Sequence, residues 1–144
     1  METTGVAKWR EEGKEPQSRS ENELSNIIIG CAIEVHKKLG PGLLESAYEE
    51  CSSYEMSEAG LLVERQKALP LTYKDVRMDC GYRLDIMVNR KVIVEIKAVE
   101  AINDIHCAQV LTYLRVTGCK LGLLINFNVL KLANGGIKRI VNNL

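Results

Sequence analysis

The residues that decide the fold read Cys80-Gly-Tyr-Arg-Leu-Asp-Ile-Met-Val-Asn-Arg-Lys-Val-Ile-Val-Glu-Ile-Lys97. Two runs of aliphatic and β-branched residues, Leu84–Val88 and Val92–Lys97, flank a short polar break at residues 89–91. This pattern predicts a β-hairpin with a three-residue loop. Because residues 92–94 are apolar on both faces, the second run is expected to be a central strand of a larger sheet.

Three charged side chains interrupt these apolar strands. Glu95 and Lys97 are two residues apart, so they project from the same face of their strand. If the loop is residues 89–91, the pairing places Asp85 directly opposite Glu95, with β-carbons roughly 5 Å apart. Two carboxylates this close repel each other unless a cation or a proton lies between them. Oxygen ligands of this kind favour magnesium or manganese over zinc.

The rest of the chain alternates between helical and strand patterns. A capping-box pattern at residues 20–23 opens the first helix, and Gly40-Pro41-Gly42 closes it. A helix between two buried strands predicts a right-handed crossover with those strands parallel. The expected fold is therefore α/β, a mixed central sheet flanked by helices. Helices are expected over residues 20–39, 44–59 and 103–117, and strands over residues 62–67, 69–73, 84–88, 92–97, 122–127 and 137–141.

A resemblance to a known family adds to this pattern. The stretch Gly42-Leu-Leu-Glu-Ser-Ala-Tyr48 matches the G-x-x-E-x-x-Y signature of the GxxExxY family, which is assigned to the PD-(D/E)XK nuclease superfamily. Asp85 followed by Glu95-Ile96-Lys97 resembles the D…(D/E)-x-K core of that superfamily. The similarity continues through residues 79–83, 108–113 and 124–128 and covers roughly residue 22 to the C-terminus.

The resemblance implies a restriction-endonuclease-like core and a metal-dependent nuclease. It would hydrolyse phosphodiester bonds of DNA, with RNA as the second choice, using Mg²⁺ or Mn²⁺. The implied metal ligands are Asp85, Glu95, the carbonyl of Ile96, and Glu45 from the second helix. Lys97 would position the attacking water or neutralise charge that develops in the transition state.

Substrate contacts are expected from two helices. Gln109 and Tyr113 resemble the Q-x-x-x-Y motif of one exonuclease-like branch of the superfamily, where it contacts the nucleic-acid backbone. Tyr48 lies on the same helix face as Glu45. It is expected to bind substrate together with Gln109 and Tyr113. A purely structural interpretation makes Tyr48 a packing residue whose hydroxyl finds a partner within the chain.

Other structural interpretations stay open. Glu45 could serve only the helix dipole, and Glu95 with Lys97 could form an ion pair, which would leave Asp85 as an unpaired negative charge. His106 could be a proton carrier, a metal ligand or a helix-surface histidine. For the whole protein, the alternative function is a catalytically inactive nucleic-acid-binding or interaction module on a nuclease-like fold. A third alternative is a metal-independent structural protein in which the three charges form a core network.

Composition limits the kind of core, partner and cysteine chemistry that the chain can have. The 144 residues are 46% hydrophobic and only 5% aromatic, which predicts an aliphatic core. The 19 bases balance the 19 acids, so net charge gives no argument for a nucleic-acid partner. After Asp104 only bases occur, which fits either a basic face or a solubilising surface. Five cysteines without a C-x-x-C pair indicate neither a disulfide framework nor a zinc site, and most are expected in the core.

Domain organisation and location follow from the same composition. Residues 1–20 lack apolar periodicity, which predicts a disordered N-terminal lead before a single domain at residues 21–144. Neither a secretory signal nor an apolar run of about 20 residues is found, so we expect a cytoplasmic protein with no membrane partner. A homodimer stays open.

Overall fold

The predicted hairpin lies inside a mixed five-stranded sheet. The computed structural model describes residues 18–144. Its elements are α2 (Glu21–Leu39), α3 (Glu45–Glu58), β1 (Val63–Ala68), β2 (Leu71–Tyr73), β3 (Val76–Met78), β4 (Arg83–Val88), β5 (Val92–Lys97), α4 (Asp104–Thr117), β6 (Leu121–Asn126) and β7 (Ile137–Val141). The order of the sheet is β1-β4-β5-β6-β7, and among these described strands only the neighbours β5 and β6 are parallel, as the crossover predicted. The α/β fold with a mixed sheet is confirmed, and the predicted disordered lead falls outside the described range, apart from residues 18–20.

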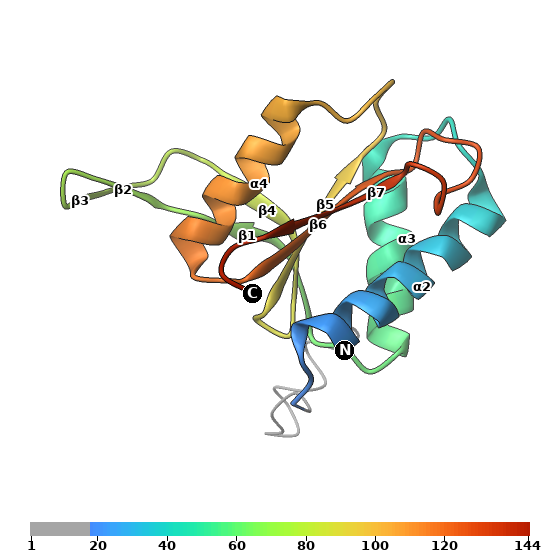
Figure 1. Cartoon of the computed structure of the whole chain (residues 1–144), viewed down its shortest axis with the longest axis horizontal. Helices are drawn as coiled ribbons and strands as arrows, with labels where there is room; N and C mark the ends of the chain where they lie inside the picture. Colours follow the sequence, from blue (N-terminus) through green and yellow to red (C-terminus); the bar gives the residue numbers. More distant parts are fainter. Residues whose placement is uncertain (1–17) are drawn as a thin grey trace.

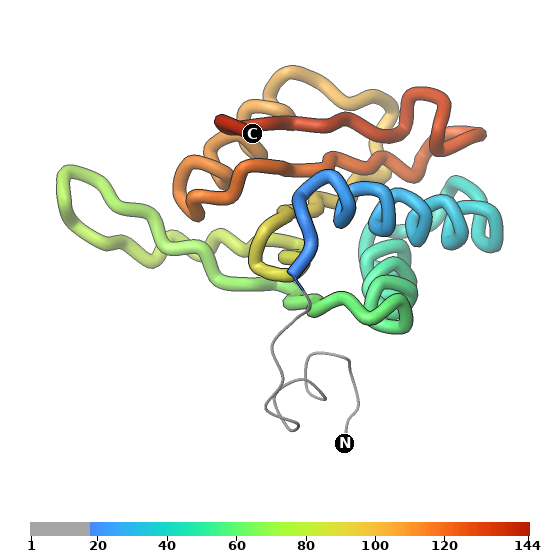
Figure 2. The backbone as a smooth tube through the Cα atoms, turned by 60° about the horizontal axis from the view of Figure 1, so that its bottom comes forward, coloured from blue at the N-terminus to red at the C-terminus, as the bar shows by residue number. Residues whose placement is uncertain are grey.

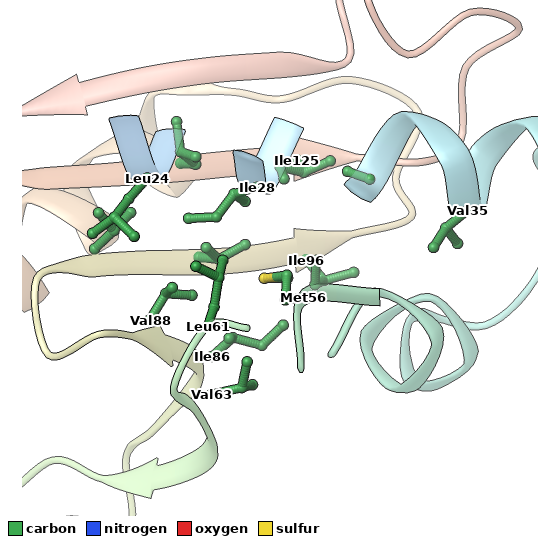
Figure 3. Packing of buried hydrophobic residues seen from close by; sticks show 14 of the residues in the cluster. Leu24, Ile28, Val35, Met56, Leu61, Val63, Ile86, Val88, Ile96 and Ile125 are labelled. Carbon is green, nitrogen blue, oxygen red and sulfur yellow. The ribbon is translucent and has the colours of Figure 1, made fainter. Parts of the chain in front are cut away.

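Helices cover both faces of the sheet. In Figure 1, α2 and α3 lie on one side and α4 on the other. The larger core packs α2 and α3 against even-numbered residues of β4 and β5, including Ile86, Val94 and Ile96 (Figure 3). The smaller core packs α4 against Ile93 and Leu124 from the opposite face. This two-layer cover explains why β5 is apolar on both faces.

Local signals account for the helix ends. The Ser20 hydroxyl accepts a hydrogen bond from the Glu23 N–H, and the Glu23 carboxylate accepts one from the Ser20 N–H. The Asn103 side chain accepts a hydrogen bond from the His106 N–H at the start of α4. Gly118 ends α4 with a positive φ of 79°, a conformation that glycine adopts without steric cost.

The strand expected over residues 69–73 is present as the shorter β2, and it does not join the main sheet. Instead, β2 and β3 form a separate two-stranded hairpin that extends away from the domain, as Figures 1 and 2 show. Lys74 and Asp75 both have positive φ, the backbone of a tight two-residue hairpin turn. The sequence pattern did not indicate that β2 and β3 would form a hairpin of their own, separate from β4.

The oxidation state and burial of the five cysteines can be compared with the prediction. All five are free thiols, as expected. Cys119 is buried, and three half-buried cysteines (Cys31, Cys51 and Cys107) pack against the two cores, so most lie in or beside the core as predicted, while Cys80 is exposed. Within residues 18–144, no helix is long and apolar enough to cross a membrane.

Candidate active site

The site begins where β4 and β5 separate. Val88 pairs with Val92 and Ile86 with Val94, which confirms the predicted register. Beyond the Ile86–Val94 pair, the carboxylates of Asp85 and Glu95 accept the backbone hydrogen bonds in place of main-chain carbonyls. The Asp85 N–H donates to the Glu95 carboxylate at 2.9 Å, and the Ile96 N–H donates to the Asp85 carboxylate at 2.9 Å. Each of the two acids thus accepts a backbone hydrogen bond from the opposite strand. Asp85 and Glu95 are called the acid pair below.

The backbone of β4 changes at this point. Ile86 and Val88 face α2 and α3, so strict alternation would also place Leu84 there. Leu84 instead packs in the α4-side core together with Met87. The alternation therefore breaks at Asp85, and β4 turns away from β5 where the acid pair lies.

Burial and proximity raise the pKa of both acids. Glu95 is 4% exposed, and desolvation, followed by the charge of Asp85, raises its pKa to about 8. Desolvation also raises the pKa of Asp85, opposed by the hydrogen bond from the Ile96 N–H. Glu95 therefore favours its protonated form at neutral pH when no cation is bound. The acid pair has the repulsion that the sequence predicted.

Lys97 and Glu45 lie at the carboxyl end of β5. The Phe127 N–H donates to the Lys97 carbonyl at 2.9 Å, which fixes the Lys97 backbone against the end of β6. The Glu45 carboxylate accepts a hydrogen bond from the Ala98 N–H at 3.0 Å, so the first turn of α3 reaches this strand end. No ion pair within 4 Å joins Lys97 to an acid among residues 18–144. The simple Glu95–Lys97 ion pair is therefore absent from this part of the chain.

Tyr48 does not face the site, so its predicted contact with substrate needs correction. Its side chain is fully buried and stacks on Phe127 with ring centroids 4.4 Å apart. Its hydroxyl donates to the Gly40 carbonyl at 2.6 Å and accepts from the Leu43 N–H at 3.0 Å. Tyr48 thus fastens the glycine-containing loop that leads into Glu45. The spacing between Glu45 and Tyr48 therefore has a structural cause, because Tyr48 fixes the loop that precedes Glu45.

Gln109 and Tyr113 lie on α4, which covers the face of β5 that carries Glu95. Tyr113 is 5% exposed, and its ring meets Tyr82 edge-on at a centroid distance of 6.4 Å. Burial, followed by the charge of Glu95, raises the pKa of Tyr113 to about 12. The phenol stays neutral and remains a potential hydrogen-bond donor beside the acid pair. Gln109, one turn earlier, is half-buried.

Glu49 is a buried acid that sequence reasoning missed. It lies one helical turn after Glu45 on α3, and its charge raises the pKa of both Asp85 and Glu95. Gln66 Nε2 donates to its two oxygens at 3.0 and 3.1 Å, and Arg65 Nε donates at 3.2 Å. The i, i+4 spacing from Glu45 was the available signal.

Gln66 has an unusual backbone. The β1–β4 register pairs Arg65 with Ile86 and Lys67 with Leu84, which leaves Gln66 level with Asp85. Its φ of 51° is left-handed, a conformation that a non-glycine residue adopts at a cost of order 1 kcal/mol. The side-chain bonds to Glu49 hold Gln66 in this conformation. Both neighbours of Asp85 across the sheet therefore depart from regular pairing.

His106 has a structural explanation. Its Nδ1 accepts a hydrogen bond from the Asn103 N–H at 3.1 Å and completes the α4 capping box. Among residues 18–144, no group of three His, Cys, Asp or Glu side chains is close enough to hold a metal ion together. The metal-ligand interpretation of His106 has no support from this geometry.

A sheet flanked by helices, with two acids and a lysine at the point where central strands separate, defines a nuclease-like α/β domain. The chain belongs to the PD-(D/E)XK nuclease superfamily, whose family model matches residues 22–140. No curated protein and no solved structure matches the sequence. A nuclease-like fold implies a nucleic-acid substrate, and nucleases of this superfamily generally use divalent metals.

Proposed function

We propose that this protein is a metal-dependent nuclease of the GxxExxY type that hydrolyses phosphodiester bonds of DNA, with RNA as the second choice. The observation that carries the proposal is the acid pair. Asp85 and Glu95 lie side by side where β4 and β5 separate, and Lys97 follows on the same strand face. A domain that needed only stability gains little from burying two adjacent carboxylates.

The donor chemistry fits a divalent cation. Burial raises the pKa of Glu95 to about 8, and a cation between the two carboxylates would remove the repulsion that contributes to this shift. Asp85, Glu95, the Ile96 carbonyl and Glu45 are the oxygen donors proposed to hold Mg²⁺ or Mn²⁺. Glu45 is bonded to the Ala98 N–H and does not lie within coordination reach of the acid pair among residues 18–144, so binding through Glu45 requires its side chain to leave that bond and move toward the pair. The bound cation would supply a Lewis acid and an activated water.

The chain's own residues have distinct roles in this proposal. Lys97 places a positive charge beside the acid pair, where it orients the attacking water or neutralises charge on the phosphate. Gln109 and Tyr113 lie on α4 above the acid pair and orient the substrate backbone. Glu49 and Gln66 support the irregular backbone beside Asp85. Tyr48 acts indirectly, because it fixes the loop that presents Glu45.

The second candidate is an inactive nucleic-acid-binding module. It is favoured by one observation: both acids already accept backbone hydrogen bonds, and no third acid joins them within coordination reach among residues 18–144. A network satisfied in this way can persist without a metal.

Metal titration separates the two candidates. The wild type and an Asp85→Asn variant are incubated with a panel of DNA and RNA substrates across a range of Mg²⁺ and Mn²⁺ concentrations. Metal-dependent cleavage by the wild type alone supports the nuclease. Binding of nucleic acid by both proteins, without cleavage under any metal condition, supports the inactive module.

A further inference from the structure

The β2–β3 hairpin and its base, residues 69–82, form an extension that no other part of the described chain covers; we call it the arm (Figure 2). Apart from Leu69 at its root and half-buried Pro70 and Leu71, all its residues are exposed. An isolated two-stranded hairpin is at best marginally stable in water, so an uncovered arm is expected to meet a partner.

The arm starts from the site itself. It connects β1, which carries Gln66, to β4, which carries Asp85. At its base, the Leu69 N–H donates to the Tyr82 carbonyl at 2.9 Å, and the Tyr82 ring packs against Tyr113 of α4. A molecule lying along the arm would therefore continue to the acid pair.

Exposed bases lie on the arm and at its root. The arm itself carries two bases, Lys74 and Arg77, and two acids, and Arg83 follows it directly, whereas the site beside it is built mainly from acids. Within the described chain, no ion pair engages Lys74, Arg77 or Arg83. Lys74 instead lies 5.6 Å from the centroid of the exposed Tyr73 ring. Besides Lys97 at the site, Lys74, Arg77 and Arg83 are therefore available to contact a phosphate backbone.

The shape of the arm suits a groove. The register pairs Leu71 with Met78, Thr72 with Arg77, and Tyr73 with Val76. Alternation therefore gives one apolar face with Tyr73 at its tip and one polar face with Arg77. The major groove of duplex DNA admits a two-stranded β-ribbon, with apolar side chains against thymine methyl groups and bases toward phosphates. At about 3.3 Å per residue for extended chain, the segment from residue 83 to residue 75 reaches at most about 25 Å, most of a helical turn.

We propose that the arm binds duplex DNA in its major groove and positions it across the acid pair. This inference rests on the proposed nuclease function and names duplex DNA as its substrate. A second copy of the chain is the competing occupant of the apolar face. The position of the arm favours DNA, because a molecule that lies along the arm would continue to the acid pair.

The test measures binding without catalysis. In an Asp85→Asn background with chelator and no metal, a labelled 30-base-pair duplex is titrated at several salt concentrations. Lys74→Gln combined with Arg77→Gln should weaken binding about tenfold and reduce the slope of log K against log salt by about 2. Lys131→Gln combined with Lys138→Gln is the matched control, since Lys131 is in the segment between β6 and β7 and Lys138 is at the start of β7, and this part of the chain lies at the opposite end of the molecule from the arm (Figure 1). The control should bind as its parent does.

Three results would overturn the inference. One is equal affinity and salt dependence in the arm and control variants. Another is an equal loss of affinity for the single strand and the duplex, which would argue against a groove. A third is dissociation of a dimer by Tyr73→Ala with Val76→Ser while duplex binding is unchanged, which would assign the apolar face to a second copy. Cleavage by the wild type is measured separately, so the nuclease proposal fails on turnover and the arm inference fails on binding.

Discussion

Replacing Glu95 with glutamine should make the metal-free protein more stable at high pH. Glutamine keeps an oxygen for the Asp85 N–H and has nearly the same volume, but it cannot ionise. The Glu95 pKa is raised from an ordinary 4.5 to about 8, so the folded state binds its proton more tightly than the unfolded state does. Wild-type stability should therefore fall as pH rises from 4.5 to 8 and level off above that, whereas the variant escapes this loss.

The magnitude follows from the same two pKa values. Each pH unit between 4.5 and 8 costs the wild type about 1.4 kcal/mol, which gives a maximum of about 5 kcal/mol at pH 9. Because Asp85 and Glu95 raise each other's pKa, part of this amount belongs to the acid pair as a whole. We expect the glutamine variant to gain about 2 to 5 kcal/mol over the wild type at pH 9 and almost nothing at pH 5.

Urea unfolding with chelator present at pH 5, 7 and 9 measures this difference. Glu100→Gln serves as the control, because Glu100 is an exposed acid that follows the same strand. Magnesium added at pH 8 should stabilise the wild type more than the glutamine variant, since only the wild type has an ionisable pair to neutralise. Parallel stability curves for the wild type and Glu95→Gln across this pH range would refute the reasoning.

Four further outcomes test the site. Asp85→Asn should leave the metal-free protein unchanged or about 1 kcal/mol more stable in thermal melts, because it relieves repulsion. Lys97→Ala should abolish turnover while isothermal titration shows metal binding intact or tighter, and Lys97→Arg should not restore turnover because a planar guanidinium replaces a compact ammonium poorly. Tyr48→Phe should cost about 1 to 2 kcal/mol in urea unfolding, since the Leu43 N–H and Gly40 carbonyl lose their partner. Calorimetry in buffers of different ionisation enthalpy should show nearly one proton released on Mg²⁺ binding at pH 7, because Glu95 is mostly protonated below its pKa of about 8.

Much of the fold could be predicted because its signals are local. The three helices follow capping and periodicity, and the β4–β5 register follows from a three-residue loop that leaves one way to pair Val88 with Val92. The same counting placed Asp85 opposite Glu95, and in the structure the Asp85 N–H donates a hydrogen bond to the Glu95 carboxylate. Sequence could not show that such bonds replace the backbone ladder, because that depends on how far the strands separate.

The missed residues depend on contacts between distant segments. Glu49 becomes part of the site only because β1 lies beside β4 and brings Gln66 level with Asp85. No local sequence pattern predicts the left-handed backbone conformation of Gln66. Tyr48 was misjudged for a related reason: its partner ring, Phe127, comes from the segment after β6, so its burial is set by packing across the whole domain.

The construction of the site argues that its irregularities are connected. A regular β1–β4–β5 sheet would satisfy every backbone group and leave no reason to bury carboxylates. Here Gln66 leaves the ladder on one side of Asp85, and Glu95 interrupts it on the other. The acid side chains accept hydrogen bonds from the Asp85 and Ile96 N–H groups, so these two donors stay paired where the strands separate. Protonation of Glu95, or the proposed cation in its place, would relieve the repulsion between the acids, and this would tie the stability of the fold to the occupant of the site.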